Sequence, residues 1–120
     1  MMVMADEFTV GVEALERGDW LSACQAFEAA LQRGQTAEAL DGLGQARWWL
    51  NDLERAIELR PRAYACYLES DRPAPAVRIA AWLAREYFTV HGNLPAAAGW
   101  ISRAESLLKK AGHCAEAGWP

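Results

Sequence analysis

The sequence has few of the features that mark secreted and membrane proteins. It holds three cysteines in 120 residues, an odd number without metal-ligand spacing, which fits a reducing compartment better than a disulfide framework. The first residues lack the basic and apolar regions of a secretory signal. The longest uncharged run, 87–102, is broken by Gly92, Asn93 and Pro95, so no stretch is expected to span a bilayer. We therefore expect a cytoplasmic protein without membrane contact.

Basic residues are also scarce. Twelve Lys and Arg against 16 Asp and Glu give a net charge of −4, whereas binding to a phosphate backbone needs a clustered basic surface. Direct nucleic-acid binding is therefore not expected. The charge is uneven, because residues 1–60 carry 11 acidic and 5 basic groups while residues 61–120 carry 5 and 7. This asymmetry favours head-to-tail contacts between copies of the chain.

Strand signals are nearly absent, and the chain consists of alanine-rich segments with apolar residues at helical spacing. Gly18, Gly34, Gly92 and Gly112 each follow such a segment, as expected where a helix ends in a left-handed residue. Pro61 is expected to kink the segment that contains it. The sequence predicts one all-α domain over 1–120. Its six helices are expected at 5–17, 19–33, 37–50, 52–69, 75–91 and 94–111.

The turns between these helices are short, so neighbouring helices are expected to run antiparallel as three hairpins. The hairpins are predicted at about 5–33, 37–69 and 75–111. The turn sequences Gly18-Asp19-Trp20 and Asn51-Asp52-Leu53 align at an offset of 33, and Gly92-Asn93-Leu94 follows 41 residues later. A small residue recurs after each turn, at Ala23, Ala56 and Ala97, where it lets two helices approach closely. The first offset is the period of a tetratricopeptide repeat.

Three sequence segments resemble the tetratricopeptide-like N-terminal region of bacterial LuxR-type transcriptional regulators. They are EALERGDWLSACQAFEAALQ (13–32), EALDGLGQARWWLNDLERAIELRPRAY (38–64) and RIAAWLAREYFTVHGNLPAAAGWISRAESLL (78–108). The resemblance covers about 11–110 and implies a short right-handed solenoid of stacked hairpins that binds something and controls a DNA-binding helix-turn-helix. The sequence departs from the pattern at Pro61 and at Arg60, a position that is usually aromatic. It lacks the helix-turn-helix, so we expect a fragment or a stand-alone relative.

The six tryptophans are the strongest functional hint. In the geometry that the resemblance implies, the first helix of each hairpin lines a concave face, with Phe8 in the first hairpin. The candidate binding residues there are Asp41, Gln45, Trp48, Trp49, Trp82 and Glu86. The alternative is that the tryptophans pack in the core between helices, and that the two carboxylates are solvated surface residues without a binding role. Trp48 and Trp49 are about 100° apart on a helical wheel, so at least one is expected to be accessible.

No catalytic or metal-binding constellation is apparent. His91, His113 and Cys114 do not have zinc-site spacing, and no serine lies in a nucleophile elbow. We therefore predict a non-enzymatic protein-interaction module without cofactor or metal, acting in transcription regulation. Acidic groups beside indole rings suit a cationic or amphipathic helix. The alternative is a small-molecule sensor domain with a Trp-rich groove. An uncapped solenoid also leaves an apolar end face, which is expected to pair in a homodimer.

Overall fold

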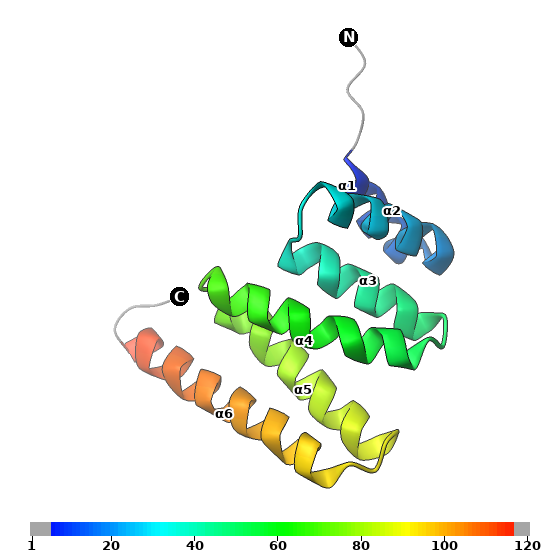
Figure 1. Ribbon diagram of the computed structural model, residues 1–120. Coiled ribbons are helices and arrows are strands. Elements are labelled where there is room, and N and C mark those ends of the chain that lie inside the picture. Colours follow the sequence, from blue (N-terminus) through cyan, green and yellow to red (C-terminus); the bar gives the residue numbers. More distant parts are fainter. Residues whose placement is uncertain (1–5, 117–120) are drawn as a thin grey trace. The chain divides into compact units, whose positions relative to one another are not determined.

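The computed structural model describes the backbone of residues 6–116 and the side chains of residues 6–110. This part of the chain forms six α-helices and no strand, so the all-helical prediction is confirmed (Figure 1). The helices are α1 (Glu7–Arg17), α2 (Trp20–Arg33), α3 (Ala37–Trp49), α4 (Leu53–Glu69), α5 (Pro73–Thr89) and α6 (Leu94–Glu116).

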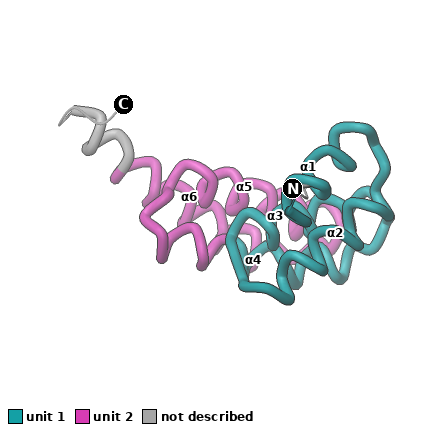
Figure 2. Tube along the Cα trace, turned by 90° about the horizontal axis from the view of Figure 1, so that it is seen from above, with its two compact units in different colours: residues 1–63 teal, residues 64–120 magenta. Residues whose placement is uncertain are grey.

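The chain divides into two compact units, residues 1–63 and residues 64–120 (Figure 2). The boundary lies inside α4, so it divides the predicted middle hairpin, 37–69. In the first unit α1 packs on α2, and α3 contacts both. In the second unit α5 packs on α6. The helix α4 runs on through Pro61, which does not end it.

The turns explain why the helices end where they do. Gly18 and Asn51 both adopt left-handed backbone conformations, with φ of 77° and 65°. In each turn the next N–H reaches back five residues, from Asp19 to the Ala14 carbonyl at 2.9 Å and from Asp52 to the Arg47 carbonyl at 2.8 Å. This bond closes a helix C-terminus. The 33-residue offset therefore aligns positions that share a conformation.

Glycine does not end every predicted helix in this way. Gly92 is left-handed, with φ of 60°, and lies three residues beyond α5. Gly34 follows α2 with φ of 169°, which is extended backbone open to any residue. Gly112 lies inside α6, which continues to Glu116. The predicted left-handed stop is therefore wrong at Gly34 and at Gly112.

Side-chain caps start the first three helices. Asp6 accepts a hydrogen bond from the Thr9 N–H at 2.8 Å, and Asp19 accepts one from the Ser22 N–H at 3.3 Å. Thr36 caps α3 in the same way. The bond from the Thr9 N–H lowers the pKa of Asp6, because it stabilises the charged carboxylate. Each cap satisfies a backbone donor that has no partner inside its helix.

Phe27 is the centre of the first unit. Its side chain is fully buried, and its ring lies between a glycine of α1 and a glycine of α3. A Cβ atom added to Gly11 would come within 2.7 Å of the ring, and one added to Gly42 within 2.5 Å. The Phe8 ring packs at 5.9 Å from the ring of Phe27. These two glycines therefore allow α1 and α3 to approach the same aromatic side chain.

Candidate functional site

The six predicted binding residues fall in two groups. Asp41, Gln45, Trp48 and Trp49 lie on α3 in the first unit, and Trp82 and Glu86 lie on α5 in the second. The two groups share a pattern of exposure: the carboxylates are buried, whereas the tryptophans are half-buried or exposed.

Asp41 is a core residue, only 3% exposed. Its Oδ1 accepts a hydrogen bond from Arg60 Nη1 at 2.7 Å and another from Gln45 Nε2 at 3.3 Å. Arg60 is itself buried, so the two charges form an ion pair inside the first unit. The prediction that Asp41 is exposed on a binding face is therefore wrong, because its carboxylate neutralises a buried guanidinium.

The neighbouring α3 backbone makes room for this ion pair. A Cβ added to Gly44 would lie 3.0 Å from Arg60 Cδ and 3.1 Å from its Nε, so glycine lets the arginine side chain lie close to the helix. The sequence did carry a signal, since Arg60 occupies a position where an aromatic residue was expected. A buried cation requires a nearby anion, and Asp41 supplies it.

Glu86 is also buried, at 4% exposure, so the prediction that it is exposed on a binding face is wrong too. Gln45 is half-buried and donates to Asp41, which ties its amide to the core ion pair. Trp82 is half-buried. Neither predicted carboxylate is therefore available at the surface for a cationic partner.

Three tryptophans of the first unit form a cluster, which we name the tryptophan cluster: Trp20, Trp48 and Trp49. The Trp49 indole stacks on Trp20, with ring centroids 5.0 Å apart and planes at 9°. Trp48 meets Trp49 edge-on, at 4.9 Å and 83°. Trp49 is 55% exposed while the other two are half-buried, which confirms that one of the adjacent pair is accessible.

Trp20 was not among the predicted binding residues, because those come from the first helix of each hairpin and Trp20 begins the second helix, after the Gly18 turn. The aromatic residue that follows such a turn can stack on an indole at the end of another helix. Here α3 supplies that indole, since it ends at Trp49 before the left-handed Asn51. The signal in the sequence was the Trp48–Trp49 pair at a helix end.

Ion pairs hold the end of α3 that carries the cluster. The Arg47 guanidinium pairs with Glu28 on α2 through Nη2 and contacts Asp52 through Nη1 at 3.7 Å. Asp52 in turn accepts a hydrogen bond from the Arg55 N–H at 3.3 Å, at the start of α4. These groups therefore tie α2, α3 and α4 together beside Trp48.

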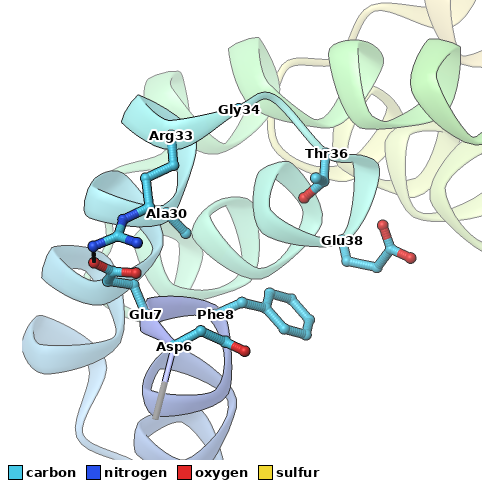
Figure 3. A pocket seen from close by; sticks show the side chains of 8 residues that line it. All are labelled: Asp6, Glu7, Phe8, Ala30, Arg33, Gly34, Thr36 and Glu38. Atoms are coloured by element: carbon cyan, nitrogen blue, oxygen red, sulfur yellow. Dashed lines mark ion pairs between the residues drawn. The ribbon is translucent and has the colours of Figure 1, made fainter. Parts of the chain in front are cut away.

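A groove lies at the other end of the first unit, with a volume of ≈ 490 Å³ (Figure 3). The start of α1, the end of α2 and the start of α3 contribute its lining: Asp6, Glu7, Phe8, Ala30, Arg33, Gly34, Thr36 and Glu38. Arg33 Nη2 pairs with Glu7 Oε1 at 2.9 Å, as the dashed line in Figure 3 marks. None of these lining residues is a tryptophan, so this groove is not the Trp-rich groove of the alternative prediction.

No protein-family model matches the chain, and no curated protein matches its sequence.

Among the described side chains, His, Cys, Asp and Glu nowhere gather in a group of three able to hold a metal ion. His113 and Cys114 lie outside the described side chains. No helix in the described part of the chain is both long and apolar enough to cross a membrane.

Proposed function

We propose that the chain is a non-enzymatic protein-interaction module that holds its partner at the tryptophan cluster. The observation that carries this proposal is the exposure of Trp49 while its ring is held against Trp20. Stacking fixes the indole before a partner arrives, which reduces the entropy lost on binding. Tryptophan is enriched among the residues that dominate binding energy. The next residue, Leu50, is also exposed and extends the apolar surface.

The partner we propose is a peptide or an amphipathic helix that carries Arg or Lys. An indole face attracts a cation, and it covers the apolar side of a helix at the same time. Asp41 and Glu86 no longer contribute to this attraction, because both are buried. The excess of acidic groups in residues 1–60 still favours approach of a basic segment.

We also propose the finer architecture that the resemblance implies, a right-handed tetratricopeptide-like solenoid as in LuxR-type regulators of bacterial transcription, in the cytoplasm. Two observations support it. The left-handed turns at Gly18 and Asn51 recur at the 33-residue offset. The small residues that follow the aligned turns, Ala23, Ala56 and Ala97, are all buried. A crystal structure with the three hairpins arranged in any other way would refute this proposal.

Substitution of Trp49 by alanine is expected to weaken partner binding by about 30-fold or more, the loss typical of a central aromatic anchor. The measurement is retention of proteins from the producing cells on the immobilised chain, followed by calorimetry with the purified partner. Val90→Ala is the matched control, since it truncates an exposed apolar residue outside the cluster. Equal binding by the two variants would contradict the proposed surface.

The second candidate function is a small-molecule sensor, and the groove at Phe8 favours it. Its volume of ≈ 490 Å³ lies within the roughly 300–1,000 Å³ of small-molecule sites. Three carboxylates and one guanidinium among its lining residues suit a cationic ligand with an apolar part. Metabolite binding that Phe8→Ala abolishes and Trp49→Ala leaves intact would favour the sensor over the interaction module.

The α6 helix carries an apolar stripe that we propose as a homodimer contact. Leu94, Ile101 and Leu108 recur every seven residues and are 58%, 51% and 56% exposed. The cavity beside Ile101, ≈ 400 Å³, is lined by both Arg85 and Glu105. A two-fold axis that passes between these two charges would set Arg85 of one copy opposite Glu105 of the other, as a self-complementary interface requires.

Ile101→Glu is therefore expected to shift the chain from dimer to monomer, because it places a charge in the apolar contact. Light scattering over a range of protein concentrations measures the mass. Leu21→Glu is the control, since Leu21 is at least as exposed as Ile101 but lies on α2. A wild-type chain that stays monomeric at high concentration would rule the homodimer out.

A further inference from the structure

The second unit contains a cavity that the proposed function does not use. Its volume is ≈ 610 Å³. Its lining comes from the C-terminal part of α4, from the start of α5 with the turn before it, and from α6. All of these residues belong to residues 64–120, so the cavity is defined within one unit. The volume is in the range of small-molecule sites.

Positive charge is concentrated around this cavity. Arg72, Arg103 and Lys110 line it, against the single carboxylate of Asp71. Arg103 and Lys110 are seven residues apart on α6 and so lie on one face of that helix. The chain as a whole has a net charge of −4. The cavity, with three cations and one anion, is therefore positively charged within a negatively charged protein. An anionic ligand is favoured there.

Aromatic rings hold two of these cations in place. The Arg103 guanidinium lies over the Trp100 ring at 4.4 Å, and Trp100 packs edge-on against Tyr64 at 5.1 Å. The Arg72 guanidinium lies over the Tyr67 ring at 5.0 Å. A guanidinium carries five N–H donors in a planar fork, a shape that matches a carboxylate or phosphate. The arginine is thus positioned before a ligand binds.

The rest of the lining combines hydroxyl groups with apolar surface. Ser102 and Ser106 lie one helical turn apart on α6 and can each donate to an anion. Leu68, Pro73 and Leu107 supply the apolar surface, and Leu107 is buried. A purely inorganic anion would leave that apolar surface in water. The cavity therefore fits a ligand with both an anionic head and an apolar body.

We propose that the second unit binds a small organic anion, a carboxylate or phosphate monoester joined to an apolar body, with Arg103 and Lys110 at its charged head. The site is independent of the tryptophan cluster, which belongs to the first unit. It also differs in sign from the groove at Phe8, whose lining carries more acidic than basic groups. One chain would then carry two sites for ligands of opposite charge.

The test is calorimetric titration of the full chain with octanoate and with octyl phosphate, below the concentrations at which they form micelles. Saturable binding is expected for at least one of them, weaker at higher salt. Inorganic phosphate, which lacks the apolar body, is expected to bind at least about tenfold more weakly. Octylammonium, which carries the opposite charge, is expected to leave the Trp100 indole N–H signal unmoved, because any binding of this cation belongs to the acidic groove at Phe8. No saturable binding of either anion, or a shift of the Trp100 signal by octylammonium as large as that by the anions, would overturn the proposal.

Matched variants locate the binding. Arg103→Gln is expected to weaken it about tenfold or more, the loss of one charge-assisted hydrogen bond. Lys110→Gln tests the second cation, with Lys109→Gln as the control that changes the same charge one residue outside the lining. The Trp100 indole N–H signal, assigned with Trp100→Phe, should shift on binding. Equal losses in Lys109→Gln and Lys110→Gln, or an unmoved Trp100 signal, would refute the site.

Discussion

Replacement of Asp41 by alanine is expected to lower the free energy of unfolding by about 3–5 kcal/mol, because it leaves the Arg60 guanidinium buried without a counter-charge. The 2.7 Å bond between the two is enclosed, with both residues under a tenth exposed. Gln45 cannot compensate, since its amide is neutral. Urea unfolding followed by circular dichroism measures the loss.

Two controls separate this effect from the general cost of a mutation. Glu28→Ala breaks the Arg47–Glu28 pair, which is more exposed to solvent, and is expected to cost only about 0–1 kcal/mol. The double variant Asp41→Leu with Arg60→Met removes both charges and should recover most of the lost stability. If Asp41→Ala costs no more than Glu28→Ala, then Asp41 is not part of a buried ion pair.

Replacement of Gly42 by alanine is expected to destabilise the chain by about 1–3 kcal/mol, although alanine is the best helix former. The new Cβ would lie 2.5 Å from the Phe27 ring. The ring cannot retreat, because Gly11 on α1 approaches it as closely from the neighbouring helix. Overpacking therefore outweighs the gain in helix propensity. The free energy of unfolding in urea is again the measurement.

Gly99→Ala is the matched control for Gly42→Ala. Gly99 is also inside a helix, but the nearest atom to its added Cβ is Arg103 Nη1 at 3.7 Å, an ordinary contact. Alanine there should stabilise the chain by roughly 0.5–1 kcal/mol through helix propensity alone. The two substitutions are thus expected to have opposite signs. Stabilisation by both would contradict the packing of Phe27 between two glycines.

The helices were predictable because their signals are local. Apolar spacing and turn residues predicted five of the six helices within two residues at each end, while α6 continues five residues beyond its predicted end, to Glu116. The alignment of Asn51 with Gly18 pointed to a turn that both residues share. The errors at Gly34 and Gly112 have a local cause as well. Gly34 follows α2 but has extended backbone, which any residue can adopt, so a glycine after a helix need not be left-handed. Gly112 lies inside α6, because glycine tolerates a helix interior at a cost of only about 1 kcal/mol.

The site was only partly predictable. The sequence predicted that at least one of Trp48 and Trp49 is accessible, since two adjacent indoles cannot face the same core, but it did not predict that the accessible one is Trp49. The burial of Asp41 depends on Arg60, a residue 19 positions away on another helix, and helical periodicity carries no information about such a pair. The same holds for the stack of Trp49 on Trp20, which joins the end of α3 to the start of α2.

The most direct measurement on the central claim is photo-crosslinking from position 49. A benzophenone side chain in place of Trp49 is expected to form a specific adduct with a protein in the producing cells, and the same group at Val90 is expected to form none. The adduct should disappear when excess unmodified chain competes for the partner. Equal labelling from both positions, or no protein adduct from position 49, would contradict the claim that the tryptophan cluster holds a protein partner.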